Sequence, residues 1–231
     1  MGLIWDGLVQ AVALMGSGDP EVLGITWLSL KLSATATVLS LVVGIPLGTF
    51  LALVRFPGRR LAIALVNTGM GLPPVVVGLF ISILLWRSGP LGALELLYTP
   101  SAIVLAQFVI AAPLVVGLTL AAVQQIPERW RLQMQALGAS RGQLLWVLVR
   151  ESRLGLLAAL MAGFGAVISE VGASLMVGGN IRGQTRVLTT ATVLETGKGN
   201  FDVAIALSVI LLGLTFLVNW VLTVLQQGRR V

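Results

Sequence analysis

The sequence contains no cysteine and no histidine among its 231 residues, and only 10% of its residues are charged. Without these two residue types the chain can form no disulfide, no thiolate nucleophile, no Cys/His zinc site and no histidine-based triad. We also find no GxxxxGKS/T phosphate-binding loop and no paired-carboxylate arrangement. We therefore expect no catalytic site, cofactor or metal site in this chain.

Apolar residues are abundant instead, at 57% of the sequence. An ordinary soluble domain has about 45–50% apolar and about 25% charged residues. A water-soluble fold could not bury this excess, so the composition predicts a protein that lies in a bilayer. The net charge of +6 is spread between apolar runs. We interpret it as loop charge that orients a membrane protein, and not as a nucleic-acid-binding surface.

Long apolar stretches predict an all-α membrane protein with five transmembrane helices. A helix needs about 20 residues to cross the hydrocarbon core of a bilayer. The predicted spans are residues 32–54, 61–86, 96–127, 154–177 and 203–228. No composition break indicates a second domain, so we expect one transmembrane domain over residues 1–231. Residues 1–15 carry Asp6 and are too short to span, so they predict an interfacial helix within an extracytoplasmic segment, residues 1–20, and not a cleavable signal peptide.

Basic residues divide unequally between the two sides of the predicted spans. Ten lie on one side: Arg55, Arg59, Arg60, Arg129, Arg131, Arg141, Arg150, Arg153, Arg229 and Arg230. Five lie on the other: Lys31, Arg87, Arg182, Arg186 and Lys198. Because cytoplasmic loops carry the excess of Lys and Arg, this division places the N-terminus outside and the C-terminus in the cytoplasm.

The connection between the third and fourth spans, residues 127–153, is long, basic and amphipathic. Helix-to-helix connections typically have only about 2–8 residues. Gly138 is placed to end one short helix in a left-handed cap, and Ser140 with Gln143 reads as a capping box that opens the next. We therefore predict a sharp corner that projects toward the cytoplasm. A plain re-entrant connector is the alternative.

Residues 135–140 (QALGAS) in this corner resemble the cytoplasmic loop of permease subunits in binding-protein-dependent ABC importers. In that family a loop with a fixed glycine, here Gly138, forms the coupling helix that docks into the ATPase subunit. The sequence differs from the family pattern at residues 132–134 and 150–151. The resemblance implies that the ATPase-coupling residues are Gln135, Ala136, Leu137, Gly138, Ala139, Ser140 and Arg141.

Two further stretches, residues 71–78 and 162–199, look like the tungstate-type permeases of that importer family. The resemblance runs from about the first span onward. It implies a homodimeric permease in the inner membrane, two cytoplasmic ATPase subunits that hydrolyse ATP, and an extracytoplasmic oxyanion-binding protein. The lipid bilayer is the remaining partner, and no nucleic acid is expected.

Pro73 and Pro74 predict that the second span kinks or unwinds in the membrane, because proline removes a backbone donor. Irregular backbone at that depth must be buried in protein or line a wet cavity, which makes a pathway role and a purely structural kink equal alternatives. Glu170 is the one acid in its apolar stretch. Since a carboxylate repels an oxyanion, we expect a gate-stabilising hydrogen bond or an ion pair with Arg182 or Arg186.

Gly178 and Gly179 precede a threonine-rich segment, residues 185–196. We predict a glycine hinge followed by an external re-entrant element that closes the outer mouth. Arg182, Arg186 and Lys198 would give that mouth a positive field attractive to an oxyanion. A docking surface for the binding protein, or ordinary solvated charge, is the alternative.

The function that follows is that of a permease subunit importing tungstate, or the similar molybdate. Two alternatives stay open at this point. One is the same architecture serving another small solute, such as sulfate, phosphate or an amino acid. The other is an ion-driven secondary carrier or channel without an ATPase, which inverted repeats or an ion-binding cluster would favour; we see neither in the sequence.

Overall fold

The computed structural model describes residues 2–227, which fold into helices without any strand. In chain order these are α1 (Gly2–Gly16), α2 (Pro20–Leu53), α3 (Arg59–Met70), α4 (Pro74–Leu85), the 3-10 helix η1 (Gly92–Leu94), α5 (Pro100–Gln124), α6 (Glu128–Ala136), α7 (Arg141–Glu151), α8 (Arg153–Ile168), α9 (Gly172–Gly178), α10 (Leu188–Gly197) and α11 (Phe201–Gln227). Arg229 and Arg230, which contribute to the charge division above, lie outside the described residues.

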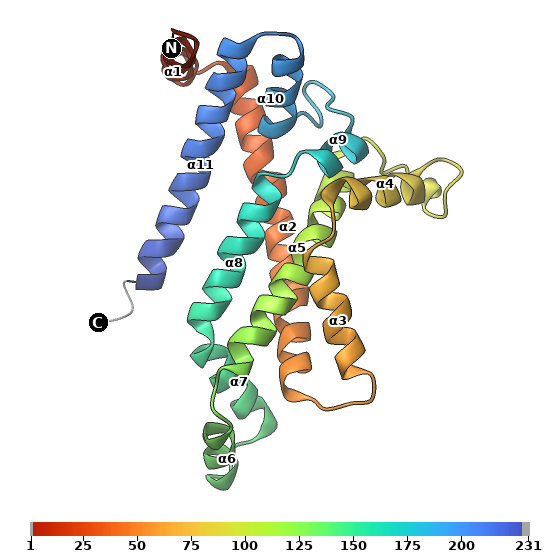
Figure 1. Cartoon of the computed structure of the whole chain (residues 1–231), viewed down its shortest axis with the longest axis vertical. Helices are drawn as coiled ribbons and strands as arrows, with labels where there is room; N and C mark the ends of the chain where they lie inside the picture. Colours follow the sequence, from red (N-terminus) through yellow and green to blue (C-terminus); the bar gives the residue numbers. More distant parts are fainter. Residues whose placement is uncertain (1, 228–231) are drawn as a thin grey trace.

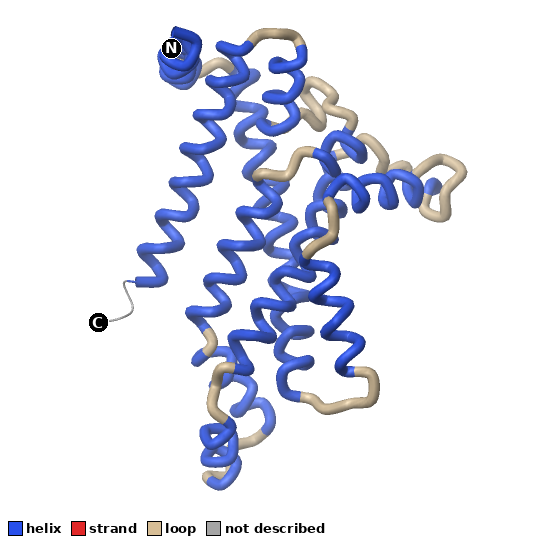
Figure 2. The backbone as a smooth tube through the Cα atoms, in the orientation of Figure 1, coloured by secondary structure: helices blue, strands red, loops and turns tan. Residues whose placement is uncertain are grey.

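Three helices are each long and apolar enough to cross a membrane, namely α2, α5 and α11. Two bent pairs, α3 with α4 and α8 with α9, pass the same criterion only when each pair is taken together, which gives up to five spans. The long helices run along one axis, with α1 and α10 at one end and α6 and α7 at the other (Figure 1). The tube in Figure 2 shows that α4 leaves this axis and projects sideways.

The first long helix, α2, begins at Pro20, well before the predicted start at residue 32. The Asp19 carboxylate accepts hydrogen bonds from the backbone N–H groups of Glu21 and Val22, at 2.9 and 3.0 Å, and so caps the helix there. Lys31, which marked the predicted boundary, lies exposed along the helix. A charged side chain that reaches solvent does not end a helix, so the apolar run underestimates the length of α2.

Small residues let the long helices approach closely. A Cβ on Gly48 of α2 would lie 2.6 Å from the carbonyl oxygen of Val116 in α5, so only glycine fits there. Gly155 of α8 lies against Ala122 of α5, and Ala159 of α8 is completely buried. The packing of α2 and α8 on α5 therefore uses small residues to bring backbones together, as in other membrane helix bundles.

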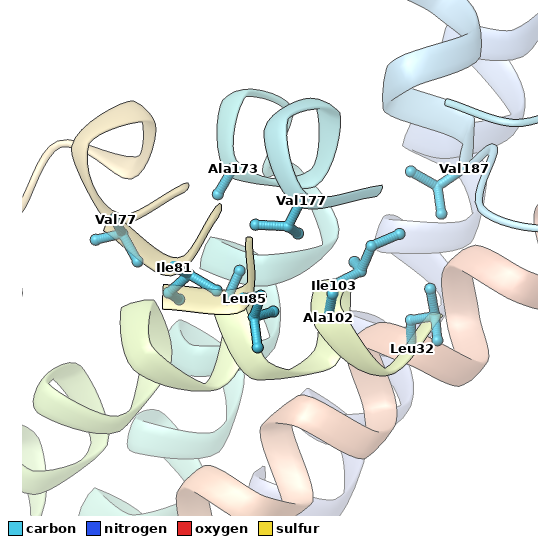
Figure 3. Close-up of a cluster of buried hydrophobic side chains, with 10 residues drawn as sticks. Leu32, Val77, Ile81, Leu85, Ala102, Ile103, Ala173, Val177 and Val187 are labelled. Atoms are coloured by element: carbon cyan, nitrogen blue, oxygen red, sulfur yellow. The ribbon is translucent and has the colours of Figure 1, made fainter. Parts of the chain in front are cut away.

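A buried apolar cluster joins α4 and α9 to the long helices α2 and α5 (Figure 3). Its members are Leu32, Val77, Ile81, Leu85, Ala102, Ile103, Ala106, Ala173, Val177 and Val187. The cluster contains residues from four helices and one loop. It therefore holds the two broken helices against the bundle and fixes where their breaks lie.

The N-terminal segment forms a helix, α1, at one end of the bundle (Figure 1). It contacts α11, where Gly7 lies directly against the Ile205 side chain. Trp5, Val9 and Val12 lie exposed at helical spacing on a different face. The helix is confirmed, and its position at the membrane interface stays a prediction that this uncovered apolar face favours.

Candidate functional site

The second predicted span is broken at the two prolines. α3 ends at Met70 and α4 begins at Pro74, and the two helix axes differ in direction by 102°. Pro73 adopts an extended conformation before α4, and Pro74 occupies its first turn, where a missing N–H costs least. The predicted kink is confirmed, and it is a complete break. A role of these prolines in a pathway stays a prediction.

The fourth predicted span is also broken, and its prediction as one helix over residues 154–177 is wrong. α8 ends at Ile168, α9 begins at Gly172, and the pair bends by 58°. The Glu170 carboxylate accepts hydrogen bonds from the backbone N–H groups of Ala173 and Ser174, at 2.7 and 2.9 Å, and from the Ser174 hydroxyl, at 2.7 Å. This side chain thus starts α9, because it supplies acceptors for the otherwise unpaired N–H groups of its first turn.

The predicted ion pair between Glu170 and Arg182 or Arg186 is wrong, because the described residues show no such pair. Glu170 forms hydrogen bonds as the alternative expected, and its role in stabilising a gate stays a prediction. Both arginines turn to Glu21 of α2 instead: Arg182 donates from Nε at 2.8 Å, and Arg186 donates at 3.5 Å. The hydrogen bond that Arg182 donates to the Glu21 carboxylate raises the pKa of Arg182 above its ordinary value. Because one carboxylate serves both guanidinium groups, this Glu21–Arg182–Arg186 cluster keeps an excess of positive charge.

The two breaks lie against each other. A Cβ on Gly78 of α4 would lie 2.7 Å from the Cα of Ala173 in α9, and a Cβ on Gly172 would lie 2.7 Å from the Cγ2 of Val75. The first turns of α4 and α9 therefore meet, at a distance that only glycine permits. Sequence reasoning missed this junction, because Gly78 and Ala173 are far apart in the chain and nothing in the sequence around either residue indicates their contact.

Gln107 of α5 is a second residue that sequence reasoning missed. Its side chain is 3% exposed, and Nε2 donates to the carbonyl oxygen of Val167 at 3.2 Å, near the end of α8. Its Oε1 has no hydrogen-bond partner among the described residues. Gln107 is a single amide in a long apolar stretch of the sequence. Burying a polar group is costly unless it is hydrogen-bonded, so this residue could have been recognised as one with a specific partner.

The predicted glycine hinge is a closely packed turn. Gly179 has a φ of +70°, and a Cβ there would lie 2.8 Å from the Tyr98 ring. A Cβ on Gly178 would lie 2.7 Å from Cδ1 of Ile103, and the Gly178 carbonyl accepts a bond from the Thr185 hydroxyl at 2.6 Å. Both glycines are needed for this turn, and its action as a hinge stays a prediction. The threonine-rich segment continues into α10, beside α11.

At the other end of the bundle, α6 and α7 form the predicted corner. The Gly138 φ is +81°, its N–H donates to Gln135, and the Ala139 N–H donates to Met134 at 3.0 Å, the paired bonds of a Schellman motif. The Ser140 hydroxyl accepts from the Gln143 N–H while the Gln143 side chain accepts from the Ser140 N–H, at 3.3 and 2.8 Å. The left-handed cap and the capping box are therefore both confirmed.

The corner is uncovered in the structure. Leu137 is 87% exposed, and a Cβ on Gly138 would meet nothing within 4 Å. Of the seven predicted coupling residues, Ala139 is half-buried, and the exposed ones are Gln135, Ala136, Leu137, Gly138, Ser140 and Arg141. The sequence thus presents an apolar side chain and a glycine turn to a surface that another protein can reach; ATPase docking stays a prediction.

The polar side chains at the α8–α9 break and at the corner cap helices: Glu170 caps α9, and Ser140 caps α7. The searched part of the described chain holds no group of three acidic side chains that could bind a metal ion. The helices that begin at the two breaks, α4 and α9, contact each other near their N-termini. The first backbone N–H groups of α9 already bond the Glu170 carboxylate.

Comparisons with known proteins agree with this arrangement. The sequence matches the family described as binding-protein-dependent transport system inner membrane component over residues 44–231. It is 43% identical, over 86% of this chain and 88% of the relative, to a probable anion ABC transporter permease protein of Haloferax volcanii. It is 39% identical to the tungstate uptake system permease protein of Peptoclostridium acidaminophilum, over 98% of this chain and all of that protein.

Among solved structures, the fold is similar to a chain of the MetNI methionine ABC transporter in an inward-facing conformation. The TM-score is 0.74 with 22% sequence identity, and the match covers 90% of this chain and 95% of that one. The α-helical bundle with two broken spans is thus the fold of an ABC importer permease. The chain belongs to the family of inner membrane permease components of binding-protein-dependent ABC importers.

Proposed function

We propose that this chain is the permease subunit that imports tungstate, or the similar molybdate, across the cell membrane. The observation that carries the substrate is the match to the tungstate uptake permease, 39% identical over the whole of that protein. The anion transporter permease at 43% identity supports the same class of substrate. Tungstate and molybdate are both tetrahedral dianions, so we propose the two anions together as the substrate.

We further propose five spans, with each bent pair counted as one crossing of the bilayer. The N-terminus lies outside and the C-terminus in the cytoplasm, in keeping with the larger number of basic residues beside the α6–α7 corner. In this orientation α1, α10 and the Glu21–Arg182–Arg186 cluster face the extracytoplasmic binding protein. The excess positive charge of that cluster suits an oxyanion that is passed inward.

The permease works as a homodimer with two ATPase subunits, one for each α6–α7 corner. A second copy has a surface to contact, because α4 leaves the bundle and exposes a row of apolar side chains. These are Val75, Val76, Leu79, Phe80, Ile83 and Leu84. Contact of such a row with water is unfavourable, so lipid or the second copy must cover it.

Movement of the corner reaches the centre of the bundle through α8. α7 ends at Glu151 and α8 begins at Arg153, so a displacement of the corner moves the N-terminal end of α8. The other end of α8 is the break that Glu170 caps, and this break contacts the break at Pro73 and Pro74 through Gly172 and Gly78. In this proposal the two contacting breaks would move between two arrangements, as alternating access requires.

The test is uptake by the assembled importer in vesicles. The permease is reconstituted with an ATPase subunit and an oxyanion-binding protein of the same organism, and internal tungsten is measured by mass spectrometry with and without ATP. We expect ATP-dependent uptake that excess molybdate suppresses and that excess sulfate, phosphate or amino acids leave unchanged. Uptake that needs an ion gradient and no ATPase would contradict the proposal, as would suppression by sulfate but not by molybdate.

A further inference from the structure

A polar pocket with three arginines lies where two of the long apolar helices end. It has a volume of about 520 Å³ and is lined by Ala52, Leu53, Arg55, Arg59, Gln124, Glu128 and Arg131. These residues come from the end of α2, the loop that follows it, the start of α3, the end of α5 and the start of α6. Neither the transport of an oxyanion nor the docking of an ATPase at Gly138 uses this pocket.

The positive charge of the pocket is not neutralised within the described chain. Three guanidinium groups face one carboxylate, that of Glu128, and none of these four groups forms an ion pair there. Arg59 is held in place because its Nε donates to the Leu51 carbonyl at 2.7 Å. Its two terminal nitrogens are left for another acceptor.

Arg131 adds the strongest indication of a missing acceptor. Its Nε is buried and has no hydrogen-bond partner among the described residues. A buried donor without a partner costs free energy, and for a charged group the cost is larger. An anion in the pocket would remove this cost, and a guanidinium group matches the oxygens of a phosphate group in two parallel hydrogen bonds.

The level of the pocket along the bundle indicates where such an anion comes from. α2 and α5 are membrane-spanning by length and hydropathy, and the pocket begins at their last residues, Leu53 and Gln124. If α2 and α5 cross the bilayer as their length and hydropathy indicate, this end of the two helices lies toward the lipid headgroups, whereas α6 continues beyond it to the corner (Figure 1). Next to the pocket, Leu47 and Phe50 are exposed on α2, where acyl chains would lie.

We propose that this pocket binds a phosphate group, carried by an anionic phospholipid of the adjacent leaflet. Basic pockets between membrane helices on the cytoplasmic side are suited to the headgroups of anionic lipids. The bound lipid would tie the end of α2 to the start of α6, next to the corner. This inference needs the membrane location of the chain but neither the tungstate substrate nor a particular partner.

The first arm of the test measures lipid preference. The full-length permease is reconstituted in phosphatidylcholine vesicles that contain spin-labelled phosphatidylglycerol, and the motionally restricted fraction is measured by electron paramagnetic resonance. The pocket variant carries Arg55→Gln and Arg131→Gln, and Arg59 is kept because it bonds the Leu51 carbonyl. The matched control carries Arg60→Gln and Arg153→Gln, two exposed arginines outside the pocket and outside the predicted coupling residues.

We expect the pocket variant to lose preference for phosphatidylglycerol by on the order of fivefold for each arginine, and the control to lose much less. Equal losses in both variants would overturn the proposal, because they would reflect general surface charge. Thermal unfolding of both variants in detergent checks that they fold like the wild type.

The second arm separates a lipid from free phosphate. Equilibrium dialysis of the detergent-purified permease against radiolabelled inorganic phosphate, without anionic lipid, measures binding of the free ion. Phosphate binding that only the pocket variant loses, with lipid preference unchanged, would assign the site to free phosphate and overturn the lipid source. Loss of ATPase co-purification with both measurements unchanged would show that these arginines contact protein, and the proposal would then be wrong.

Discussion

The α6–α7 corner and the α8–α9 break are both turns between two helices, and in both a polar side chain caps the second helix. At the corner all the bonds that define the turn lie between Met134 and Gln143, and the surface is exposed. At the break the cap by Glu170 is local, but the Glu170 carbonyl also accepts a bond from the Thr189 hydroxyl at 2.9 Å. The corner is therefore a local structure, while the break depends on the whole bundle.

This difference predicts different costs for removing the central residue of each turn. The largest effect is expected for Glu170→Ala, which leaves the N–H groups of Ala173 and Ser174 buried without their acceptor. At about 1–3 kcal/mol for each of these two unsatisfied donors, the free energy of unfolding should fall by about 2–6 kcal/mol, and uptake should be lost. Thermal or denaturant unfolding of the purified permease measures the first quantity, and vesicle uptake measures the second.

Glu170→Gln refines this result, because the glutamine side chain keeps one oxygen as an acceptor. It should lose less than half as much stability as Glu170→Ala, whereas an ion-pair role would make the two variants equally poor. The control is Glu151→Ala, which removes an exposed carboxylate from the end of α7. If Glu170→Ala is as stable as Glu151→Ala, the carboxylate does not hold the break together.

The corner should respond in the opposite way, with little loss of stability and a large loss of coupling. Gly138→Val forces a branched residue into a φ of +81°, which costs about 1–2 kcal/mol, while its side chain meets open space. Insertion should survive, and unfolding of the bundle should change little because the corner is exposed. Retention of the ATPase subunit during purification and substrate-stimulated ATP hydrolysis measure the coupling.

Two variants separate backbone strain from bulk at this corner. Gly142→Val adds the same side chain to α7, where a Cβ also meets open space but the backbone is helical. Gly138→Asn keeps a residue that tolerates the left-handed conformation. Normal coupling in Gly138→Val would mean that the corner is only a connector, the alternative that the sequence left open.

The same contrast explains what the sequence could and could not predict. Gly138, Ser140 and Gln143 form their turn within a few residues, so helix-capping rules were sufficient to predict it. The break at Pro73 was predictable for the same reason, since proline changes its own backbone. The break at Glu170 contains no proline, and an apolar run with one acid looks like a single helix.

The wrong partner for Glu170 has a related cause. Arg182 and Arg186 are the nearest basic residues in sequence after it, but Glu21, which they bond, is far away in the chain. Proximity in sequence is a poor guide to ion pairs in a bundle, because loops bring distant helix ends together. The contact of Gly78 with Ala173 was unpredictable for the same physical reason: a close approach of two backbones depends on the packing of both helices.

The smallest effect is expected at Gln107, the other support of the break. Gln107→Met removes the bond to the Val167 carbonyl, but that carbonyl still accepts from the Glu170 N–H at 3.3 Å. The substitution also removes the buried Oε1 that has no partner in the described chain. Because an apolar group of similar shape replaces a half-satisfied amide, the free energy of unfolding should change by less than about 1 kcal/mol.

Uptake of tungstate by the Gln107→Met variant in vesicles then tests the role of the unpaired Oε1 of Gln107. The matched control is Thr119→Val, which removes another buried oxygen of α5 that has no partner among the described residues. If Gln107 only supports the end of α8, both variants should be as stable as the wild type and transport tungstate at a similar rate. If Gln107→Met stays folded but loses uptake while Thr119→Val keeps it, the amide contacts the transported anion or its water. The α8–α9 break would then line the pathway itself, and its difference from the corner would be one of function as well as of folding.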